Sequence, residues 1–167
     1  MSELQGVIVS INQTIDEIVN ISKELPEEIL RWKPEEGVWS IMEVLCHVEE
    51  ATPYWLNELQ QVIASPGIEW GRGLQHEGRL AAVAQASQQT KDKVLKRITD
   101  SKQKLRDVLG SLNSEDLSIE SPSRNPRFGT KPMTFIVDHL LLAHVDQHLN
   151  QIKRNVQQYE ETNRKRG

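Results

Sequence analysis

Three histidines at helical spacing carry the most specific chemistry in this sequence. His144 and His148 lie four residues apart in LLLAHVDQHLNQI, and His47 lies far upstream in SIMEVLCHVEE. Residues four apart share one helix face, about one turn from each other, so both imidazoles can point at one metal ion. A third imidazole from a neighbouring helix would leave one position for water or substrate, as in a catalytic zinc-type site.

The same histidines also have plain structural explanations. A lone histidine on an apolar face, such as His47, is more often a core or surface residue than a ligand, and H-x-x-x-H arises by chance in helical proteins. His139 precedes His144 by five residues, which places it well round the helix from the pair. His76 lies in a glycine-rich loop without a partner at ligand spacing. We therefore expect neither His139 nor His76 to be a ligand.

Three residues beside the histidines are further candidates for the site. Cys46 adjoins His47, but helix neighbours diverge by about 100°, so we interpret Cys46 as a small buried apolar residue rather than a nucleophile. Glu43 lies one turn before His47 and could orient it, although a helix-capping role accounts for it equally well. Gln151, three residues after His148, is placed to touch the site or its ligand.

Composition sets limits on the classes of function. The chain has 167 residues, enough for one domain over residues 1–167, with a net charge of −4 and a single cysteine. The charge argues against a nucleic-acid-binding face, and one cysteine cannot form an internal disulfide. The first residues lack the basic segment of a signal peptide, and no apolar run approaches a membrane-spanning length. We expect a soluble, cytoplasmic protein.

Apolar periodicity predicts long helices joined by loops that contain proline and glycine. Residues spaced by three and four predict helices over 4–22, 40–63, 79–109 and from about 132 onward, with a short acidic element near residue 26. Residues 111–131 are expected to form a loop. Four main helices and one long connection predict an all-α fold, a four-helix bundle, in which metal sites are built from facing helices.

Local signals refine these elements. Ser40 and Glu43 have the spacing of a capping box at a helix start, and Pro53 is expected to kink that helix. Gly110 is expected to be a C-cap. We interpret Trp32 and Trp39 as packing residues, and Trp55 and Trp70 as candidates for the border of a pocket. The glycine-rich segment 71–78 could flank the same cleft.

Two segments resemble the DinB-like superfamily, which includes the bacillithiol- and mycothiol-dependent transferases and isomerases. They are LPEEILRWKPEEGVWSIMEVLCHVEEATPYW and TFIVDHLLLAHVDQHLNQI. The shared marks are a Trp-Ser helix start, a histidine about seven residues later, and a late H-x-x-x-H-x-x-Q-I run. The resemblance spans residues 4 to about 156 and implies a four-helix bundle with an unusual connection.

The resemblance also implies a divalent metal bound by three histidines, which correspond to His47, His144 and His148. It implies a homodimer as well. Zinc, nickel and manganese all accept imidazole ligands, and we favour zinc or nickel. A cation with an open position lowers the pKa of bound water toward about 7, or binds a thiolate directly.

Thiol chemistry is the favoured activity. No further acid or histidine is placed by spacing as a general base, which mildly favours a thiol-dependent S-transferase using a low-molecular-weight thiol such as bacillithiol. A metal-dependent hydrolase and a non-catalytic metal- or ligand-binding bundle remain alternatives. A zinc protease would carry glutamate directly after the first histidine, where this chain has Val145. A nuclease would need carboxylate ligands and a basic surface.

Overall fold

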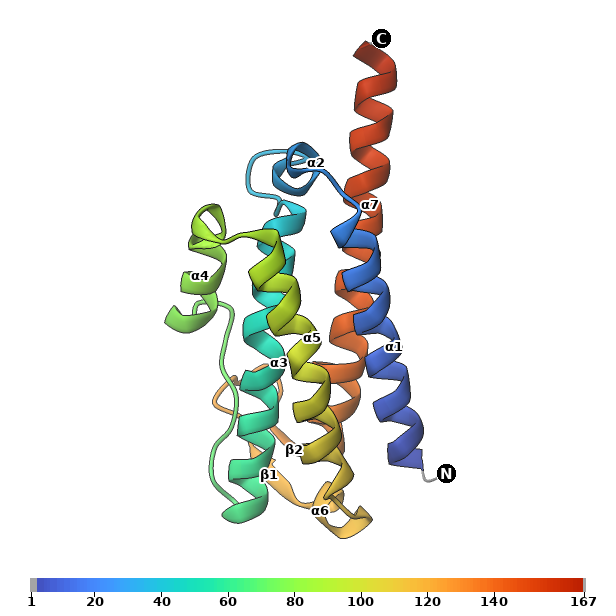
Figure 1. The fold of residues 1–167 in the computed structure, drawn as a ribbon. Coiled ribbons are helices and arrows are strands. Elements are labelled where there is room, and N and C mark those ends of the chain that lie inside the picture. The colour runs from blue at the N-terminus through green and yellow to red at the C-terminus, as the bar shows by residue number, and fades with distance from the viewer. Residues whose placement is uncertain (1–2, 167) are drawn as a thin grey trace.

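Four long helices form the bundle in the computed structural model, which describes residues 3–166 (Figure 1). They are α1 (Glu3–Lys23), α3 (Ile41–Ala64), α5 (Lys91–Gly110) and α7 (Ala143–Arg166). Both α1 and α3 pack against α5 and α7. The short acidic element is α2 (Glu27–Arg31), and the π-helical segment η2 (Ile136–Leu142) runs directly into α7. The predicted all-α four-helix bundle is confirmed.

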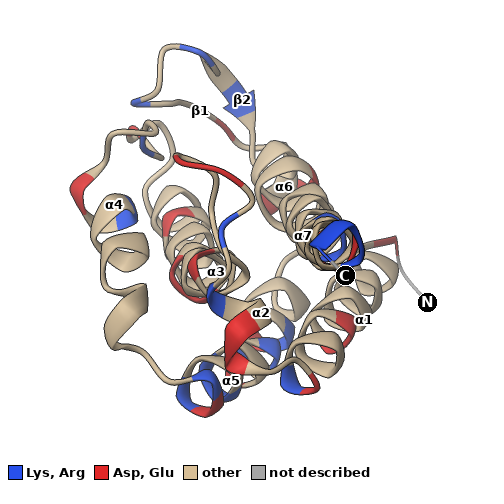
Figure 2. Ribbon diagram, turned by 90° about the horizontal axis from the view of Figure 1, so that it is seen from above, with Lys and Arg blue, Asp and Glu red and all other residues tan. Residues whose placement is uncertain are grey.

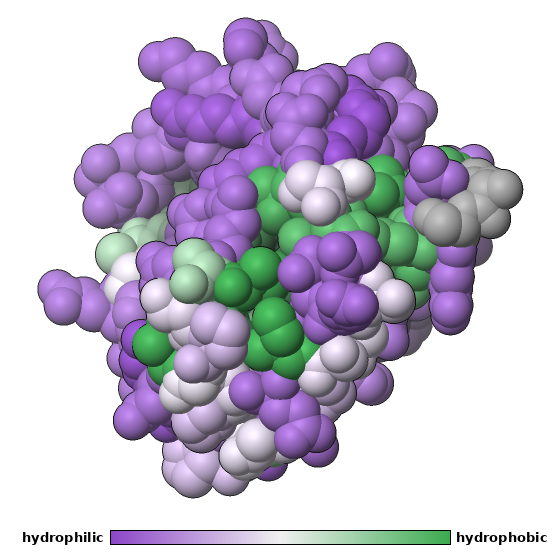
Figure 3. All heavy atoms as spheres, turned by 90° about the horizontal axis from the view of Figure 1, so that it is seen from below, coloured by the Kyte–Doolittle hydropathy of each residue, from purple (hydrophilic) through white to green (hydrophobic). Residues whose placement is uncertain are grey.

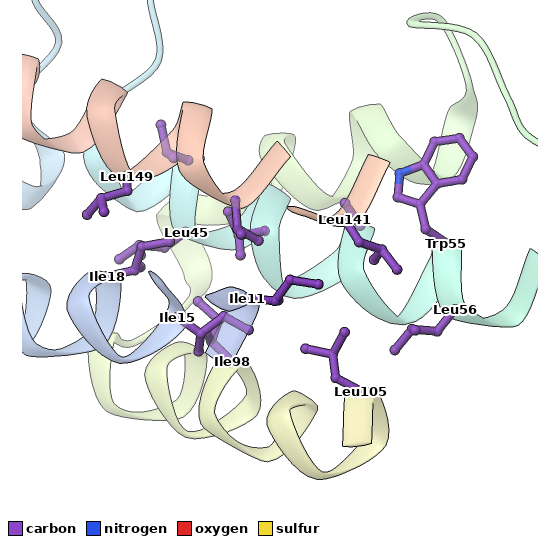
Figure 4. Packing of buried hydrophobic residues seen from close by; sticks show 14 of the residues in the cluster. Ile11, Ile15, Ile18, Leu45, Trp55, Leu56, Ile98, Leu105, Leu141 and Leu149 are labelled. Atoms are coloured by element: carbon purple, nitrogen blue, oxygen red, sulfur yellow. The ribbon is translucent and has the colours of Figure 1, made fainter. Parts of the chain in front are cut away.

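The core lies where the apolar stripes of these helices meet. Ile11, Ile15 and Ile18 of α1 are fully buried and recur at three- and four-residue spacing. Side chains from the other three sides converge on them (Figure 4), namely Leu45 and Leu56 of α3, Ile98 and Leu105 of α5, Leu141 of η2 and Leu149 of α7. This packing fixes α3 and α7, the two helices that carry the candidate histidines, relative to each other.

The predicted capping box is present at the start of α3. Ser40 Oγ accepts a hydrogen bond from the Glu43 backbone N–H at 3.1 Å, and Glu43 Oε1 accepts one from the Ser40 N–H at 2.9 Å. Lys33 also donates to Glu43, at 3.0 Å. α3 then continues through Pro53 to Ala64. Glu43 therefore serves the helix start, and His47 follows one turn later.

The single helix predicted over 79–109 is wrong. The structure divides this span into α4 (Glu77–Ala84), the 3₁₀ turn η1 (Ala86–Gln88) and α5. Thr90 caps α5 by accepting a hydrogen bond from the Lys93 N–H at 3.4 Å. α4 has no buried residue, so no apolar stripe joins it to α5.

The predicted C-cap at Gly110 is also wrong. Gly110 is the last residue of α5, Ser111 is the cap, and φ at Gly110 is not positive. A left-handed C-cap glycine would require positive φ.

The segment expected to be a loop, 111–131, contains regular structure. It includes α6 (Ser114–Ser118), and an antiparallel pair of strands follows, β1 (Glu120–Pro122) and β2 (Thr130–Pro132). Glu120 pairs with Pro132, so Pro132 ends β2 instead of starting the last helix. None of the helices within residues 3–166 combines the length and apolar character needed to cross a membrane.

Candidate metal centre

The structure brings His47, His144 and His148 together at one point between α3 and α7. His144 Nε2 lies 2.9 Å from His47 Nε2 and 3.0 Å from His148 Nε2. The three potential ligand atoms all lie within 4.8 Å of one another, and no other group of three or more potential ligands of this kind occurs in residues 3–166. Nitrogens that share a metal ion at 2.0–2.1 Å lie roughly 3 Å apart. The geometry of the cluster therefore fits one ion.

His144 lies next to a π-helical segment. It is the second residue of α7, and α7 begins directly after η2. Such segments are rare and frequently occur at functional sites. His139, within η2, is exposed and packs against Phe135 with ring centroids 4.7 Å apart. His76 accepts a hydrogen bond from the Gly78 N–H at the start of α4. As expected, neither His139 nor His76 belongs to the cluster.

Gln151 fixes the orientation of His148. His148 Nδ1 lies 2.8 Å from Gln151 Oε1, an oxygen that can only accept, so Nδ1 carries the hydrogen. The neutral ring then presents a lone pair at Nε2, toward His144. Hydrogen bonds of this kind set the tautomer and the basicity of metal-ligating histidines. The expected contact of Gln151 with the site is confirmed.

Burial keeps the three rings neutral. Desolvation, followed by the nearby His144, lowers the pKa of His47 to about 2. Desolvation and His148 lower the pKa of His144 to about 3. Burial also lowers the pKa of His148, against the opposing effect of its bond to Gln151. At neutral pH the rings are therefore unprotonated, and each has a nitrogen lone pair that can bind a metal cation.

Cys46 takes no part in this arrangement. Its side chain is 2% exposed, and burial followed by the charge of Glu49 raises the pKa of the thiol to about 11. A thiol at this pKa is inert, because the nucleophile is the thiolate. The expectation of a small buried apolar residue agrees with its position in the core cluster.

Trp39 forms a wall of the site, which the sequence did not indicate. Its ring packs against His47 and His148, with centroids 5.1 and 6.4 Å away. Asn155 of α7 donates a hydrogen bond to the Trp39 carbonyl at 2.9 Å. The tryptophan thus limits how the two rings can turn.

The histidines line a cavity of about 630 Å³. Its other walls come from α3, from the segment after α3 together with α4, from the β1–β2 connection and from the helix of His144. Three arginines contribute to the lining: Arg72, Arg79 and Arg127. Trp55 borders the cavity, as predicted, whereas Trp70 is fully buried behind it. Gly73 is in the lining, so the glycine-rich segment does flank the cleft.

A network of charges holds the segment after α3 in place. Arg72 is 6% exposed. Its guanidinium group donates hydrogen bonds to both carboxylate oxygens of Glu50, and the bond to Oε2 is 2.7 Å long. The guanidinium group also lies 3.8 Å above the Tyr54 ring. Tyr54 donates to Glu58 Oε1 at 3.0 Å, and the same oxygen accepts from the Gly71 N–H at 2.8 Å. Glu50, Tyr54 and Glu58 of α3, which are partly or fully buried, therefore order the cavity wall.

The β1–β2 hairpin is fastened to the same segment. Trp70 Nε1 donates to the Ser121 carbonyl at 2.8 Å, and the Trp70 N–H donates to Pro122 O at 3.1 Å. Arg124 donates to Glu58 at 2.9 Å. These bonds bring the turn that carries Arg127 to the cavity.

The sequence comparison decides the family. The sequence profile of the DinB superfamily matches residues 10–152. The chain belongs to the DinB superfamily. No curated protein sequence matches it significantly.

Solved structures share the fold at low sequence identity. YfiT from Bacillus subtilis, described as a probable metal-dependent hydrolase with an unusual four-helix bundle topology, is 9% identical, with a TM-score of 0.76 over 93% of this chain and 90% of YfiT. A mycothiol-dependent maleylpyruvate isomerase is 14% identical, with a TM-score of 0.71 over 90% of this chain. This chain spans 61% of the isomerase.

Proposed function

We propose that the protein is a divalent-metal-dependent S-transferase that uses a low-molecular-weight thiol, with His47, His144 and His148 as the metal ligands. The observation that carries the proposal is the convergence of three neutral imidazoles at Nε2–Nε2 distances of 2.9 and 3.0 Å beside a cavity. When bound, the cation would lower the pKa of a thiol and hold it as the thiolate.

The protein residues orient the ligands and shape the space around them. Gln151 holds His148 in the tautomer whose Nε2 can ligate. Trp39 restrains the rings of His47 and His148. The cavity of about 630 Å³ is in the range of small-molecule sites. With three neutral ligands, the metal would keep one open position for the thiol, and the cavity would hold the electrophile beside it.

The lining of the cavity favours thiol transfer over hydrolysis. No Asp or Glu is among the described residues that line it, so a general base for activating water is missing there. In S-transfer, the thiolate sulfur forms a bond to carbon, the leaving group departs with its electron pair, and the thiol proton passes to solvent. The mycothiol-dependent isomerase with the same fold adds support for a thiol.

Two alternatives have support of their own. YfiT, described as a probable metal-dependent hydrolase, supports hydrolysis at a site of the same fold. The low exposure of the histidines, 4% for His47 and 6% for His148, would also suit a bundle that binds a metal or a small ligand without turnover. Zinc and nickel are the metals that we favour, because both accept imidazole nitrogen.

A homodimer is part of the proposal. Apolar atoms gather on the lower end of the bundle, around the beginning of α1 (Figure 3). Such patches frequently mark association surfaces. Sedimentation at micromolar protein concentration should give twice the mass of one chain, and a monomer would contradict this part of the proposal.

The test of the activity is an assay with bacillithiol and a halogenated aromatic electrophile on protein loaded with zinc or nickel. We expect turnover that is lost with a chelator and restored by the metal. His148→Ala should abolish it, whereas His139→Ala, at an exposed histidine outside the cluster, should not.

Two results would count against the S-transferase. Turnover at the same rate after complete metal removal, or in His148→Ala, would remove the three-histidine site from the reaction. Failure of the metal-loaded protein to turn over any member of a broad thiol panel would favour the binding bundle instead.

A further inference from the structure

Three arginines line the cavity, and they are not equivalent. Arg72 is neutralised by its paired bonds to Glu50. Arg79 and Arg127 make no ion pair with any residue in the described part of the chain, although each contributes to the lining. Two guanidinium groups therefore face the cavity without a carboxylate of their own.

Arg79 is held on the wall without an ion pair of its own, and the nearest compensating charge is that of Glu50, which Arg72 already binds. Arg79 projects from α4, donates to the Leu74 carbonyl at 3.1 Å, and lies 5.3 Å from the centroid of the Trp39 ring. Partial burial, followed by the charge of Arg72, lowers the pKa of Arg79, while the charge of Glu50 raises it. The guanidinium stays protonated, because the ordinary pKa of arginine lies far above neutral pH. Trp39 also contacts His47 and His148, so this charge lies beside the three histidines.

Arg127 lies in the connection between β1 and β2, which forms another wall of the cavity. Its backbone N–H donates to Asn125 Oδ1 at 3.1 Å, and the Phe128 N–H donates to the Asn125 carbonyl at 3.0 Å, which forms a tight turn. The turn presents the exposed Arg127 side chain to the cavity without fixing its head group. The guanidinium is thus free to bind a ligand.

The cavity has a charge opposite to that of the whole chain. The sequence holds 24 acidic and 20 basic residues, yet the described residues of the lining include three arginines and no acid. Figure 2 shows basic positions on α4 and on the β1–β2 hairpin, both outside the four long helices. The other polar lining groups include the amides of Gln75, Asn125 and Gln147, which can donate hydrogen bonds.

A divalent cation held by the three histidines would add to this imbalance. Three neutral imidazoles do not offset the charge of a divalent cation, and the adjacent guanidinium groups are cationic as well. Planar guanidinium groups match carboxylates and phosphates in shape and charge. We propose that Arg79 and Arg127 bind a carboxylate or phosphate group of the molecule that occupies the cavity beside the three histidines.

This inference deepens the proposed function by naming the class of ligand, a small organic anion, and it concerns the same cavity. Binding does not require turnover, thiol or electrophile. The two proposals therefore fail separately: a protein without S-transferase activity can still bind the anion, and an active enzyme can lack the anion site.

The test is calorimetric titration of the full-length, zinc-loaded protein with succinate, inorganic phosphate and the neutral analogue succinamide. We expect one or both anions to bind and succinamide to bind much more weakly. The stronger of the two anions distinguishes a carboxylate from a phosphate source. Arg79→Gln with Arg127→Gln should weaken the binding by about tenfold or more, since charged hydrogen bonds are lost.

Arg106→Gln is the matched control, because Arg106 is exposed on α5, outside the cavity lining. It should bind the anions as the unsubstituted protein does. Metal content and thermal stability are measured for each variant, and we expect both to be unchanged because neither Arg79 nor Arg127 is buried.

Three results would overturn the proposal. They are the binding of neither anion, the binding of succinamide as tightly as succinate, and the same anion affinity in the double variant as in Arg106→Gln. Repeating the titrations after chelation separates anions held by the arginines from anions held by zinc alone. A double variant that loses affinity only in the zinc-loaded state still supports the proposal.

Discussion

Asn155 donates a hydrogen bond to the backbone carbonyl of Trp39 at 2.9 Å, across 116 residues of sequence. Asn155 is 3% exposed and lies on α7, the helix that also carries His144 and His148. Trp39 directly precedes the Ser40 cap of α3 and packs against His47. This one bond therefore ties the start of the His47 helix to the helix of the other two histidines.

We expect Asn155→Ala to destabilise the fold and to weaken metal binding at the proposed three-histidine site together. The substitution leaves the Trp39 carbonyl without its partner, which costs about 1–3 kcal/mol when the group is buried. Urea unfolding measures the stability, and competition with a chromophoric chelator measures zinc affinity. Asn150→Ala, at an exposed position of the same helix, is the control. Unchanged stability and affinity in Asn155→Ala would show that the bond contributes nothing.

His144→Ala should remove the metal centre. His144 lies within 3.0 Å of both partners, so it is the middle member of the cluster. Loss of a residue that only supports a ligand costs about 10–100-fold in metal affinity, and loss of a ligand should exceed about 100-fold. Elemental analysis of purified protein and chelator competition give the stoichiometry and the affinity. A variant that keeps both would disprove the ligand assignment, provided that His139→Ala behaves as the unsubstituted chain does.

Gln151→Leu tests the contact that sets the tautomer of His148. Without the acceptor at Nδ1, the ring is free to move its hydrogen to Nε2, which would block ligation. We expect zinc affinity to fall by about tenfold or more while the fold is retained, because Gln151 would support the proposed ligand His148 without being a ligand itself. The exposed Gln158, substituted in the same way, should have no effect. Equal affinities in the two variants would refute the positioning role.

Much of this arrangement could be predicted from local sequence. The four-residue spacing of His144 and His148 places them on one face of a helix, and the Ser40–Glu43 box fixes where the helix of His47 begins. Both patterns depend only on residues within about one helical turn, so they can be recognised without knowledge of the tertiary contacts. That His47 meets the pair was implied by resemblance and not by spacing.

The cavity walls could not be predicted in this way. β1 and β2 have three residues each, too short for an alternating pattern, and each ends in proline. Arg127 reaches the cavity because its turn is held by contacts between distant residues, such as the bond of Trp70 to Ser121, 51 residues away. Arg79 was expected within one long helix, but α4 buries no residue and is placed by tertiary contacts. Contacts between residues far apart in the chain cannot be recognised from the sequence around either residue.

The depressed pKa values of the histidines make stability depend on pH. A histidine in the unfolded chain titrates near its ordinary pKa of about 6.5, whereas the pKa of His47 in the folded protein is about 2 and that of His144 about 3. Between these values the unfolded state binds more protons than the folded state. The free energy of unfolding therefore falls as the pH falls below about 6.5 and is insensitive to these groups above it.

For metal-free protein we expect the free energy of unfolding to fall by up to about 1.4 kcal/mol per pH unit for each of these histidines as the pH falls from 6 to 4. Urea unfolding at a series of pH values in the presence of chelator measures the slope. His47→Gln removes one of the titrating groups and should reduce the slope by about that amount, whereas His139→Gln, at the exposed histidine, should leave it as it was. A His47→Gln slope equal to that of the unsubstituted protein would show that His47 protonates as readily in the folded chain as in the unfolded one, contrary to its burial.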